Sequence, residues 1–421
     1  IFSSMNKYGK ESLEKNKNIK ELSYFFSRIY NFHFFQKKKL LFCFFFIREG
    51  DKMFTSQTFE NIWKIEFLSV SKKKNNNEYI ILTTKKIAPK PKKKAFNFIE
   101  IWEYSEKNKL KRKSRLCFNG NEIWDIGWNQ LIQRNIKKNF GTIALCCGFS
   151  LKIIEIPNFL PSRLEIFSFS INIDLINIFQ WKMCWKNSEI VTGDIGGKII
   201  SYNLGRKLYI KQIINYAHKN LPIGSLKIFF SKGPVGKKFL VTGGFDGYVK
   251  LWNLKDSFMN LFQINFFSSK ILSLDFSFEN FGNLGIFIGL DNGFFSTVFL
   301  KNDFLTSIQF NHTSNLLGIK IKKNLIFTLG EDGELSILEI NTPFLPERVS
   351  LNLLSSHNLL FHLKFKFKNK NSGLQNLKKK FFSKNLNGKF VPPNNYIVSS
   401  GGNSGIIVFH RFFLKNNYKK N

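Results

Sequence analysis

Residues Ala217–Asp256 decide the fold of this chain, and they read AHKNLPIGSLKIFFSKGPVGKKFLVTGGFDGYVKLWNLKD. Their apolar runs predict three strands, at Ser225–Ser231, Lys238–Thr242 and Tyr248–Leu254. A tight turn at Phe245-Asp246-Gly247 separates the second strand from the third. Asp-Gly between two apolar runs is a strong hairpin signal, because both central residues of a type I′ turn need positive φ. The stretch therefore predicts an antiparallel β-meander.

Four side chains of this stretch stand where one hydrogen-bond network could join the loop, the second strand, the turn and the third strand: His218, Thr242, Asp246 and Trp252. The stretch resembles a WD repeat, with Ala217-His218 in place of Gly-His and Trp252-Asn253 in place of Trp-Asp. The resemblance implies one blade of a β-propeller. The alternative is an isolated hairpin in another β fold, and copies of the unit elsewhere in the chain would exclude it.

Such copies recur along the chain. Clear ones begin at Ser188, Gly285, Leu325 and Tyr396, and weaker ones at Ala95 and Thr142. With the first unit they make seven, at a spacing of roughly 40–60 residues, which is the period of propeller blades. A four-stranded unit cannot bury both faces alone, so such units pack around a channel. The sequence thus predicts an all-β chain that forms a seven-bladed WD40-type β-propeller.

The four-residue network is only partly kept in the copies. One copy retains the equivalent His312, Thr328 and Asp332, but it has Leu338 at the tryptophan position. The turn aspartate is replaced by Gly196 in one further copy and by Ser404 in another. We therefore expect the unit around Asp246 to be the best-determined blade, and a change at Ser404 to be nearly neutral.

The propeller is expected to span residues 40–412. A loosely ordered or helical basic leader (1–39) precedes it, and a basic tail (413–421) follows it. A basic insertion (368–393) interrupts the last blade after an opening strand at Leu359–Phe367.

The apolar run Leu40–Ile47 is expected to close the ring. A strand from one terminus can complete the sheet of the blade at the other terminus, and this removes an open sheet edge. We therefore predict that Leu40–Ile47 pairs with the last blade near Gly405–Phe412.

The chain is strongly basic, with 64 Lys and Arg against 29 Asp and Glu and a formal charge of +35. It is also rich in Phe, Ile and Asn, which share A/T-rich codons with Lys, so part of the charge reflects composition. Basic runs that cluster in connections on one face of a propeller can bind phosphates through salt-dependent contacts. This reasoning predicts a polyanion-binding surface on one sector, and a solvated surface without a ligand is the alternative. The surface comprises Lys72, Lys73, Lys74, Lys109, Lys111, Arg112, Lys113, Arg115, Lys378, Lys379 and Lys380.

No motif for catalysis or for metal or cofactor binding stands out in the sequence. The glycines and lysines at 233–238 have the wrong spacing for a phosphate loop and lie between strands instead of opening a helix. The five cysteines show no Cys-x-x-Cys spacing, which favours free thiols in a reducing compartment. No apolar run reaches the length of a membrane helix. We expect a non-enzymatic protein with no cofactor, no metal and no membrane partner.

The order of blade signatures adds a narrower resemblance. The motifs are Phe98-Ile-Glu-Ile-Trp102, Ile123-Trp124-Asp125, Gly243 to Trp252, and Ile271-Leu-Ser-Leu-Asp275. Together they are similar to the WD-repeat subunits of transcription factor IIIC, which recognises internal promoters for RNA polymerase III. The resemblance implies a nuclear scaffold that contacts protein subunits and the nucleic-acid backbone. A scaffold in RNA processing, ribosome assembly or chromatin, or a cytoplasmic one, is the alternative.

Overall fold

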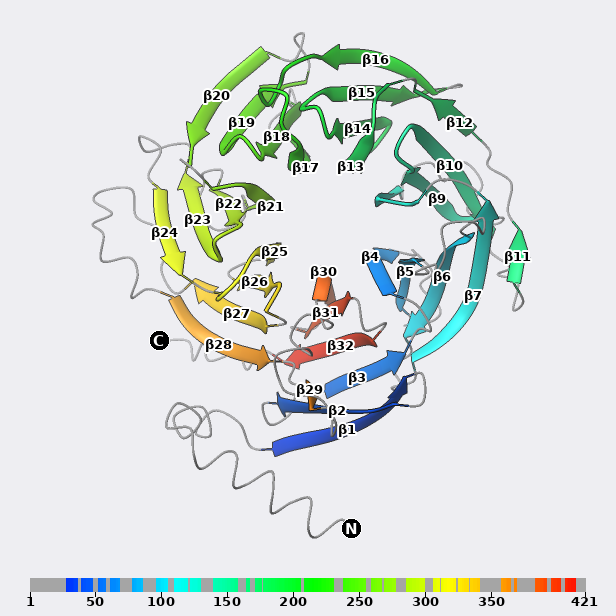
Figure 1. The fold of residues 1–421 in the computed structure, drawn as a ribbon, viewed down its shortest axis with the longest axis vertical. Helices are drawn as coiled ribbons and strands as arrows, with labels where there is room; N and C mark the ends of the chain where they lie inside the picture. Colours follow the sequence, from blue (N-terminus) through cyan, green and yellow to red (C-terminus); the bar gives the residue numbers. More distant parts are fainter. Residues whose placement is uncertain are drawn as a thin grey trace, which may run out of the picture.

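The chain folds into a β-propeller, a ring of sheets around a central channel (Figure 1). The regular structure of the described residues is all β-strand, which confirms the predicted fold class. The computed structural model describes residues 28–36, 39–47, 52–57, 61–68, 78–85, 96–104, 110–119, 122–129, 139–157, 164–166, 171–175, 177–205, 208–230, 238–254, 259–266, 269–277, 285–299, 306–310, 312–322, 325–332, 334–340, 357–364, 367–368, 383–391, 395–402 and 406–413.

Within these ranges, six sheets contain four antiparallel strands each, and the first-named strand of each is nearest the channel. They are β8 (Asp125–Asn129), β9 (Asn139–Cys146), β10 (Ser150–Pro157) and β12 (Ile171–Asp174); β13 (Gln180–Lys186), β14 (Glu189–Asp194), β15 (Ile199–Leu204) and β16 (Leu208–Ile214); β17 (Ile223–Phe230), β18 (Lys238–Gly244), β19 (Tyr248–Asn253) and β20 (Met259–Asn265); β21 (Ile271–Ser277), β22 (Gly285–Leu290), β23 (Phe294–Phe299) and β24 (Thr306–Phe310); β25 (Leu316–Lys322), β26 (Leu325–Gly330), β27 (Glu334–Ile340) and β28 (His357–Lys364); and β30 (Ser383–Val391), β31 (Asn395–Gly402), β32 (Ile406–Phe413) and β3 (Lys52–Gln57).

The repeat expected near Ala95 lies in a five-stranded sheet instead, so the prediction of seven equivalent four-stranded blades is corrected to six. This sheet contains β4 (Asn61–Leu68), β5 (Glu78–Lys85), β6 (Phe96–Tyr104), β7 (Leu110–Asn119) and β11 (Leu164–Ile166). β11 belongs in sequence to the next repeat but pairs in parallel with β7, Leu164 opposite Arg115. β7 is the outer strand of this sheet, and β11 covers part of its free edge.

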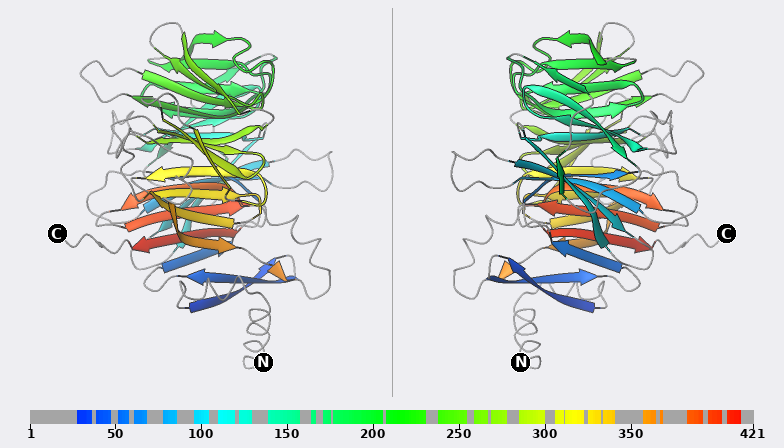
Figure 2. Two further views of the ribbon diagram at one scale, coloured as in Figure 1. Left: turned by 90° about the vertical axis from the view of Figure 1, so that its left-hand side faces the viewer. Right: turned by 90° about the vertical axis from the view of Figure 1, so that its right-hand side faces the viewer.

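A strand from the N-terminal side closes the ring, but it is not the predicted one. β3 pairs with β32, from Lys52 opposite Arg411 to Gln57 opposite Ile406. The predicted segment is β2 (Lys39–Ile47), which pairs with β1 (Arg28–Gln36) and with the two-residue β29 (Phe367–Lys368). Only two residues separate β1 from β2, so their hairpin closes with little loss of chain entropy and leaves β3 to meet β32. Both views of Figure 2 show the β1–β2 sheet outside β3, at the rim of the ring.

Two further boundaries differ from expectation. Residues 28–36 of the leader form a strand, and residues 1–27 lie outside the described chain. The expected opening strand of the last blade, Leu359–Phe367, mostly forms β28, the outer strand of the preceding sheet. The true innermost strand, β30, begins within the expected insertion. The β25–β27 sheet needs an outer fourth strand, and β28 supplies it. The boundary between the last two blades therefore lies after β28 and not before it.

The predicted hairpin is confirmed with a different turn. β18 and β19 are joined by the three residues Phe245, Asp246 and Gly247, and the N–H of Gly247 donates to the carbonyl of Gly244 at 3.2 Å. Among these three residues only Gly247 has positive φ, at 78°. A turn followed by a left-handed glycine is the usual three-residue hairpin loop. It keeps the side chain of Asp246 on the inner side of the loop.

Apolar side chains fill the space between neighbouring sheets. Between the sheets of β13–β16 and β17–β20, the buried cluster consists of Val191, Ile199, Ala217, Ile223, Leu226, Ile228, Leu240, Trp252 and Leu254. Equivalent clusters fill the spaces on either side of the β8 and β21 sheets. Trp252 therefore has its ring in an interface between blades, while its indole nitrogen remains available to the polar network.

Candidate functional site

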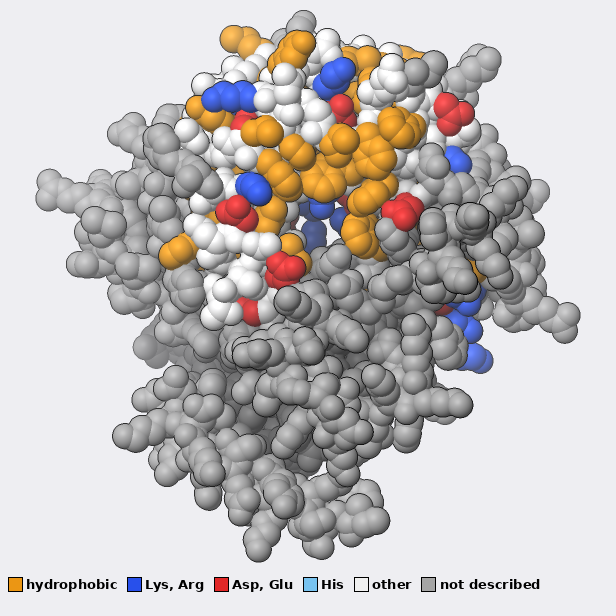
Figure 3. Space-filling model, viewed as in Figure 1, with side chains coloured by type: hydrophobic (Ala, Val, Ile, Leu, Met, Phe, Trp, Pro, Cys, Tyr) orange, Lys and Arg blue, Asp and Glu red, His pale blue; other side chains and the backbone are white. Residues whose placement is uncertain are grey.

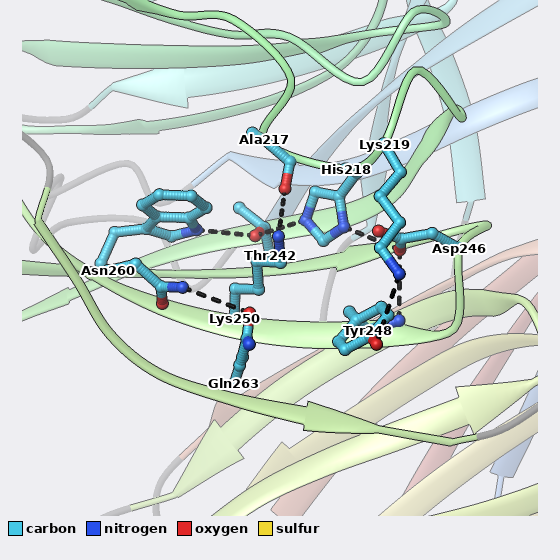
Figure 4. A network of polar contacts seen from close by, with 10 residues as sticks. Ala217, His218, Lys219, Thr242, Asp246, Tyr248, Lys250, Asn260 and Gln263 are labelled. Carbon is cyan, nitrogen blue, oxygen red and sulfur yellow. Dashed lines mark hydrogen bonds and ion pairs between the residues drawn. The ribbon is translucent and has the colours of Figure 1, made fainter.

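The four predicted network residues of the β17–β20 sheet are joined by hydrogen bonds in one line (Figure 4). The indole N–H of Trp252 donates to Thr242 Oγ1 at 2.8 Å. Thr242 Oγ1 lies 2.8 Å from His218 Nε2, and His218 Nδ1 lies 2.9 Å from Asp246 Oδ1. Asp246 also accepts from the backbone N–H of Tyr248 at 3.1 Å. The network fastens the loop before β17 to both strands of the hairpin.

The partners of His218 suit a neutral imidazole. Trp252 can only donate, so the Thr242 oxygen accepts from it, and with a neutral imidazole the Thr242 hydroxyl donates to His218 Nε2. His218 Nδ1 then carries the imidazole proton and donates it to Asp246. Burial lowers the pKa of His218, although the Asp246 carboxylate raises it. The lowered pKa favours the neutral imidazole in this network.

A second network of the same kind lies in the β25–β28 sheet. His312 Nδ1 is 3.2 Å from Asp332 Oδ1, and His312 Nε2 is 3.0 Å from Thr328 Oγ1. The other Asp332 oxygen accepts from the backbone N–H of Thr313 at 2.9 Å. The structure thus brings together the three residues that the sequence pointed to. Position 338, opposite Ile326, holds leucine and supplies no indole donor.

Asp246→Ala is expected to lower the free energy of unfolding by about 1–3 kcal/mol, because it leaves the buried N–H groups of His218 and Tyr248 without their acceptor. Guanidinium denaturation monitored by tryptophan fluorescence measures the change. Asn292→Ala is the matched control: Asn292 occupies the corresponding turn, accepts from the N–H of Phe294 and is exposed. A loss as large at Asn292 would contradict the role of the network. Ser404 lies outside the described residues.

The predicted basic surface is only partly described, and one of its segments is not a loop. Lys111, Arg112, Lys113 and Arg115 lie on strand β7. Arg112 and Arg115 each lie 3.3 Å from Glu100 Oε1, and Lys113 lies 2.7 Å from Glu103 Oε2 on the neighbouring β6. These cross-strand pairs engage three of the four charges and leave Lys111 exposed. Outside the described residues lie Lys72, Lys73, Lys74, Lys109, Lys378, Lys379 and Lys380.

Sequence reasoning missed an aromatic surface around one mouth of the channel. Trp63 and Trp181 occupy the irregular position near the start of β4 and of β13, where an extra residue in the strand changes the aim of a side chain. The Trp63 ring packs edge-on against Trp124 with centroids 5.4 Å apart, and Trp124 packs against Phe179 at 5.5 Å. Phe179 in turn contacts Phe149. The contacts form one continuous arc.

A second aromatic pair lies on the next two sheets. Trp181 packs edge-on against Phe245, which lies in the same hairpin turn as Asp246. Ile195 and Leu221, in neighbouring loops, are 47% and 43% exposed, and Phe149 is 47% exposed. Figure 3 shows the apolar side chains gathered around a central hollow on this side of the ring. We call this surface the aromatic face; it comprises Trp63, Trp124, Phe149, Phe179, Trp181, Ile195, Leu221 and Phe245.

Charged side chains line the channel beneath this face. Lys64 Nζ lies 2.7 Å from Asp125 Oδ1, an ion pair between β4 and β8. Asp125 Oδ2 also accepts from the backbone N–H of Met183 on β13 at 3.0 Å. On the other side of the ring, Asp275 accepts from the N–H of Ile321 at 2.9 Å. The sequence signal was a charged residue between apolar ones on an innermost strand, as in Trp63-Lys64-Ile65-Glu66.

The described residues show no cluster of three His, Cys, Asp or Glu side chains that could hold a metal ion. Cys117, Cys146, Cys147 and Cys184 are free thiols, and burial raises the pKa of Cys147 to about 12. Within the described ranges, no helix has the length and apolar character needed to cross a membrane. Comparison of the whole chain with known protein-family models and with curated proteins found no match.

Proposed function

We propose that this protein is a non-enzymatic scaffold that binds protein partners through its aromatic face. The observation that carries the proposal is the apolar surface around the channel mouth, which contains the ring contacts from Trp63 to Phe149 and the separate pair of Trp181 and Phe245. Interface centres are enriched in tryptophan, tyrosine and phenylalanine, because a rigid ring buries a large area with little loss of conformational entropy. Contiguous exposed apolar surface on a soluble domain marks an interaction site.

The proposal includes the finer architecture. Counting the five-stranded β4–β7 sheet together with the six four-stranded sheets, we propose a seven-bladed ring of the WD40 type. Contacts between successive innermost strands support it, since β4, β8, β13, β17, β21 and β25 each touch the next, and β30 touches both β25 and β4. The two histidine networks support the WD40 type. One contains His, Thr, Asp and Trp, and the other contains His, Thr and Asp at the equivalent positions of its sheet.

We further propose that the scaffold is a nuclear subunit of a transcription factor IIIC-like complex that serves RNA polymerase III. This rests on the blade signatures around Trp102, Trp124 and Trp252. In such a complex the basic loop residues would contact a nucleic-acid backbone, with a salt-dependent affinity. A scaffold in RNA processing, ribosome assembly or chromatin remains the alternative.

Affinity purification of the tagged full chain, followed by mass spectrometry, separates the two settings. Polymerase III factors and tRNA genes are expected to copurify, whereas pre-rRNA or spliceosomal RNA would favour the alternative.

A second experiment tests the aromatic face itself, with a triple variant that changes Phe149, Ile195 and Leu221 to serine. Because these side chains are exposed, folding should be retained, and partner recovery should fall by at least about 10-fold.

The matched control changes Tyr209, Met259 and Leu261 to serine. These residues are also exposed, at 53%, 63% and 45%, but they lie on the outer strands β16 and β20, away from the channel mouth. Partner recovery is expected to stay at the wild-type level. Equal recovery by the two triple variants would contradict the assignment of the binding surface to the aromatic face.

A further inference from the structure

A group of lysines lies at the end of the ring opposite the aromatic face, where the β13–β16 and β17–β20 sheets meet (Figure 1). Lys186 and Phe230 are the last residues of β13 and β17, two strands that start next to the aromatic face. Lys238 begins β18 and pairs with Phe230. Because a strand rises about 3.3 Å per residue, this end lies roughly 20 Å from the aromatic face.

One buried carboxylate holds two of these lysines close together. The side chain of Glu189, on β14, is only 4% exposed. Lys211 Nζ lies 3.4 Å from Glu189 Oε1, and Lys238 Nζ lies 3.3 Å from Glu189 Oε2. Lys211 belongs to β16 of the same sheet and Lys238 to the neighbouring sheet. Glu189 therefore gathers ammonium groups from two sheets at one place.

An aromatic ring, and not a carboxylate, holds the third lysine. Lys186 Nζ lies 4.7 Å from the centroid of the Phe230 ring, and Lys238 Nζ lies 5.8 Å from the same centroid. Attraction to the face of a ring positions an ammonium group without neutralising its charge. Among the described residues, no carboxylate oxygen lies within ion-pair distance of Lys186 Nζ. Lys186 is thus positioned but keeps its full charge.

The group carries more positive than negative charge, and solvent reaches it. Three ammonium groups share the single carboxylate of Glu189, so two positive charges are not compensated within the group. The side chains of Lys211 and Lys238 are 38% and 33% exposed, and Lys186 is exposed. An anionic ligand can therefore contact all three without any strand moving.

The lysine-rich composition of the chain does not explain this excess, because such a bias would affect both ends of the strands alike. At the aromatic end, the turns and strand ends hold Lys198 and Lys219 together with Asp194 and Asp246, so the charges balance. At the other end, the segments that join these strands in sequence contain one acidic residue, Asp256, and five basic ones: Arg206, Lys207, Lys232, Lys237 and Lys255. The excess belongs to one end of the two sheets.

We propose that Lys186, Lys211 and Lys238 form a binding site for the backbone of a nucleic acid. Two successive phosphodiester groups, with one negative charge each, match the uncompensated charge. Lysine contacts phosphate oxygens as a point charge and reads no base, so binding is independent of sequence and falls with salt. The inference rests on the nucleic-acid contact in the proposed function and gives it a place outside the predicted basic surface. A protein on the aromatic face and a nucleic acid at the opposite end could bind together.

Fluorescence anisotropy tests the site with the purified full chain and a labelled thymidylate oligomer of about 20 nucleotides, between about 50 and 200 mM salt. Lys186→Gln is expected to weaken binding about 5-fold at the lower salt concentration. It should also reduce the slope of log affinity against log salt by about 0.7, the value for one phosphate contact on a single strand. A uridylate oligomer of the same length should respond equally, because the contacts are to phosphate.

Lys219→Gln is the matched control. Lys219 is also an exposed lysine over a ring, with its Nζ 4.3 Å from the centroid of Tyr248, but it lies at the aromatic end of the same sheets. Its substitution should leave both the affinity and the salt slope unchanged.

Glu189→Gln provides a readout of opposite sign, which a purely structural role would not give. Glutamine keeps the shape of the side chain and an oxygen that can accept from Ser201, but it removes the charge that competes for Lys211 and Lys238. The oligomer should therefore bind this variant about 3-fold more tightly than the wild type. Circular dichroism confirms that the variant is folded, and the Lys186 comparison decides the question if it is not.

The outcomes distinguish this inference from the proposed function. If Lys186→Gln binds as well as Lys219→Gln, or folded Glu189→Gln binds more weakly than the wild type, the site is overturned while the nucleic-acid contact stands elsewhere. If the wild type binds neither oligomer at about 50 mM salt, the site and the nucleic-acid contact both fail, and the aromatic face is unaffected. If a glutamate peptide of about 20 residues binds more tightly and loses more affinity in Lys186→Gln, the partner is an acidic protein and the phosphate assignment is wrong.

Discussion

Asp125→Ala is expected to lower the free energy of unfolding by about 3–4 kcal/mol. Asp125 is almost fully buried, at 3% exposure, and it joins three sheets. It lies on β8, forms the ion pair with Lys64 on β4 and accepts from the N–H of Met183 on β13. Alanine would leave the Met183 N–H without an acceptor and Lys64 beside Lys182 without a counter-charge. Guanidinium denaturation of both proteins at pH 7 measures the difference.

Two variants control this experiment. Asp174→Ala removes an aspartate from β12 of the same sheet, where the carboxylate is exposed and accepts from Asn172, so the change should stay within about 0.5 kcal/mol. Asp125→Asn keeps an oxygen that can accept from Met183 and removes only the charge, so its effect should lie between the other two. A loss of stability at Asp174 as large as that at Asp125 would refute the role assigned to the inter-sheet aspartate.

What the sequence revealed were the features that local chemistry determines. Asp246-Gly247 marked the hairpin because a turn of this length needs a residue with positive φ, and the structure has Gly247 in that conformation. The spacing of His218, Thr242 and Trp252 reported a network within one repeat, which short connections bring together. Such signals depend on residues within one repeat, and they recur in part in the repeat that contains His312.

Pairing between distant segments could not be predicted in the same way. β2 and β3 are both strand-forming and lie near each other, and nothing within either segment says which will meet β32. β1 decides the outcome, because it pairs with β2 in a local hairpin and leaves β3 to pair with β32. The same holds for β28, whose composition suits either the last strand of one sheet or the first strand of the next.

Strand β7 was taken for a loop because its residues Lys111, Arg112 and Lys113 suggest a solvated run. The outer strand of a blade has one edge and much of its surface in water, so its composition approaches that of a loop. The missing information was the partner strand: Glu100 and Glu103 on β6 stand across from these cations. Cross-strand pairs of opposite charge stabilise a sheet, but they become visible only once the register is known.

The channel charges were missed for a related reason. Lys64 or Lys227 alone looks like an ordinary polar residue in an alternating strand, and only the ring places them together. No local signal gives the distance between residues on sheets at opposite sides of a channel. The effect of Lys64 and Glu66 on the pKa of Lys227 is a consequence of the closed ring alone.

Gly224→Ala is also expected to cause a large loss of stability, because the innermost strands β17 and β21 lie very close together at Gly224. Gly224 lies at the irregular position of β17, between Ile223 and Ser225. A Cβ atom there would lie 1.8 Å from the backbone oxygen of Ile271 on β21, a separation that no side-chain rotation can relieve. The backbones of two sheets would have to move apart, so we expect a loss of about 3 kcal/mol in the free energy of unfolding.

Gly196→Ala is the matched control, because an added Cβ there would meet only Asp194, with its nearest atom at an ordinary 3.4 Å. Its effect should be close to zero, or slightly stabilising through the unfolded state. In Gly224→Ala, separation of β17 from β21 would also move Lys227 away from Asp275, whose charge raises the pKa of Lys227. Wild-type stability in Gly224→Ala would show that β17 and β21 do not approach each other so closely.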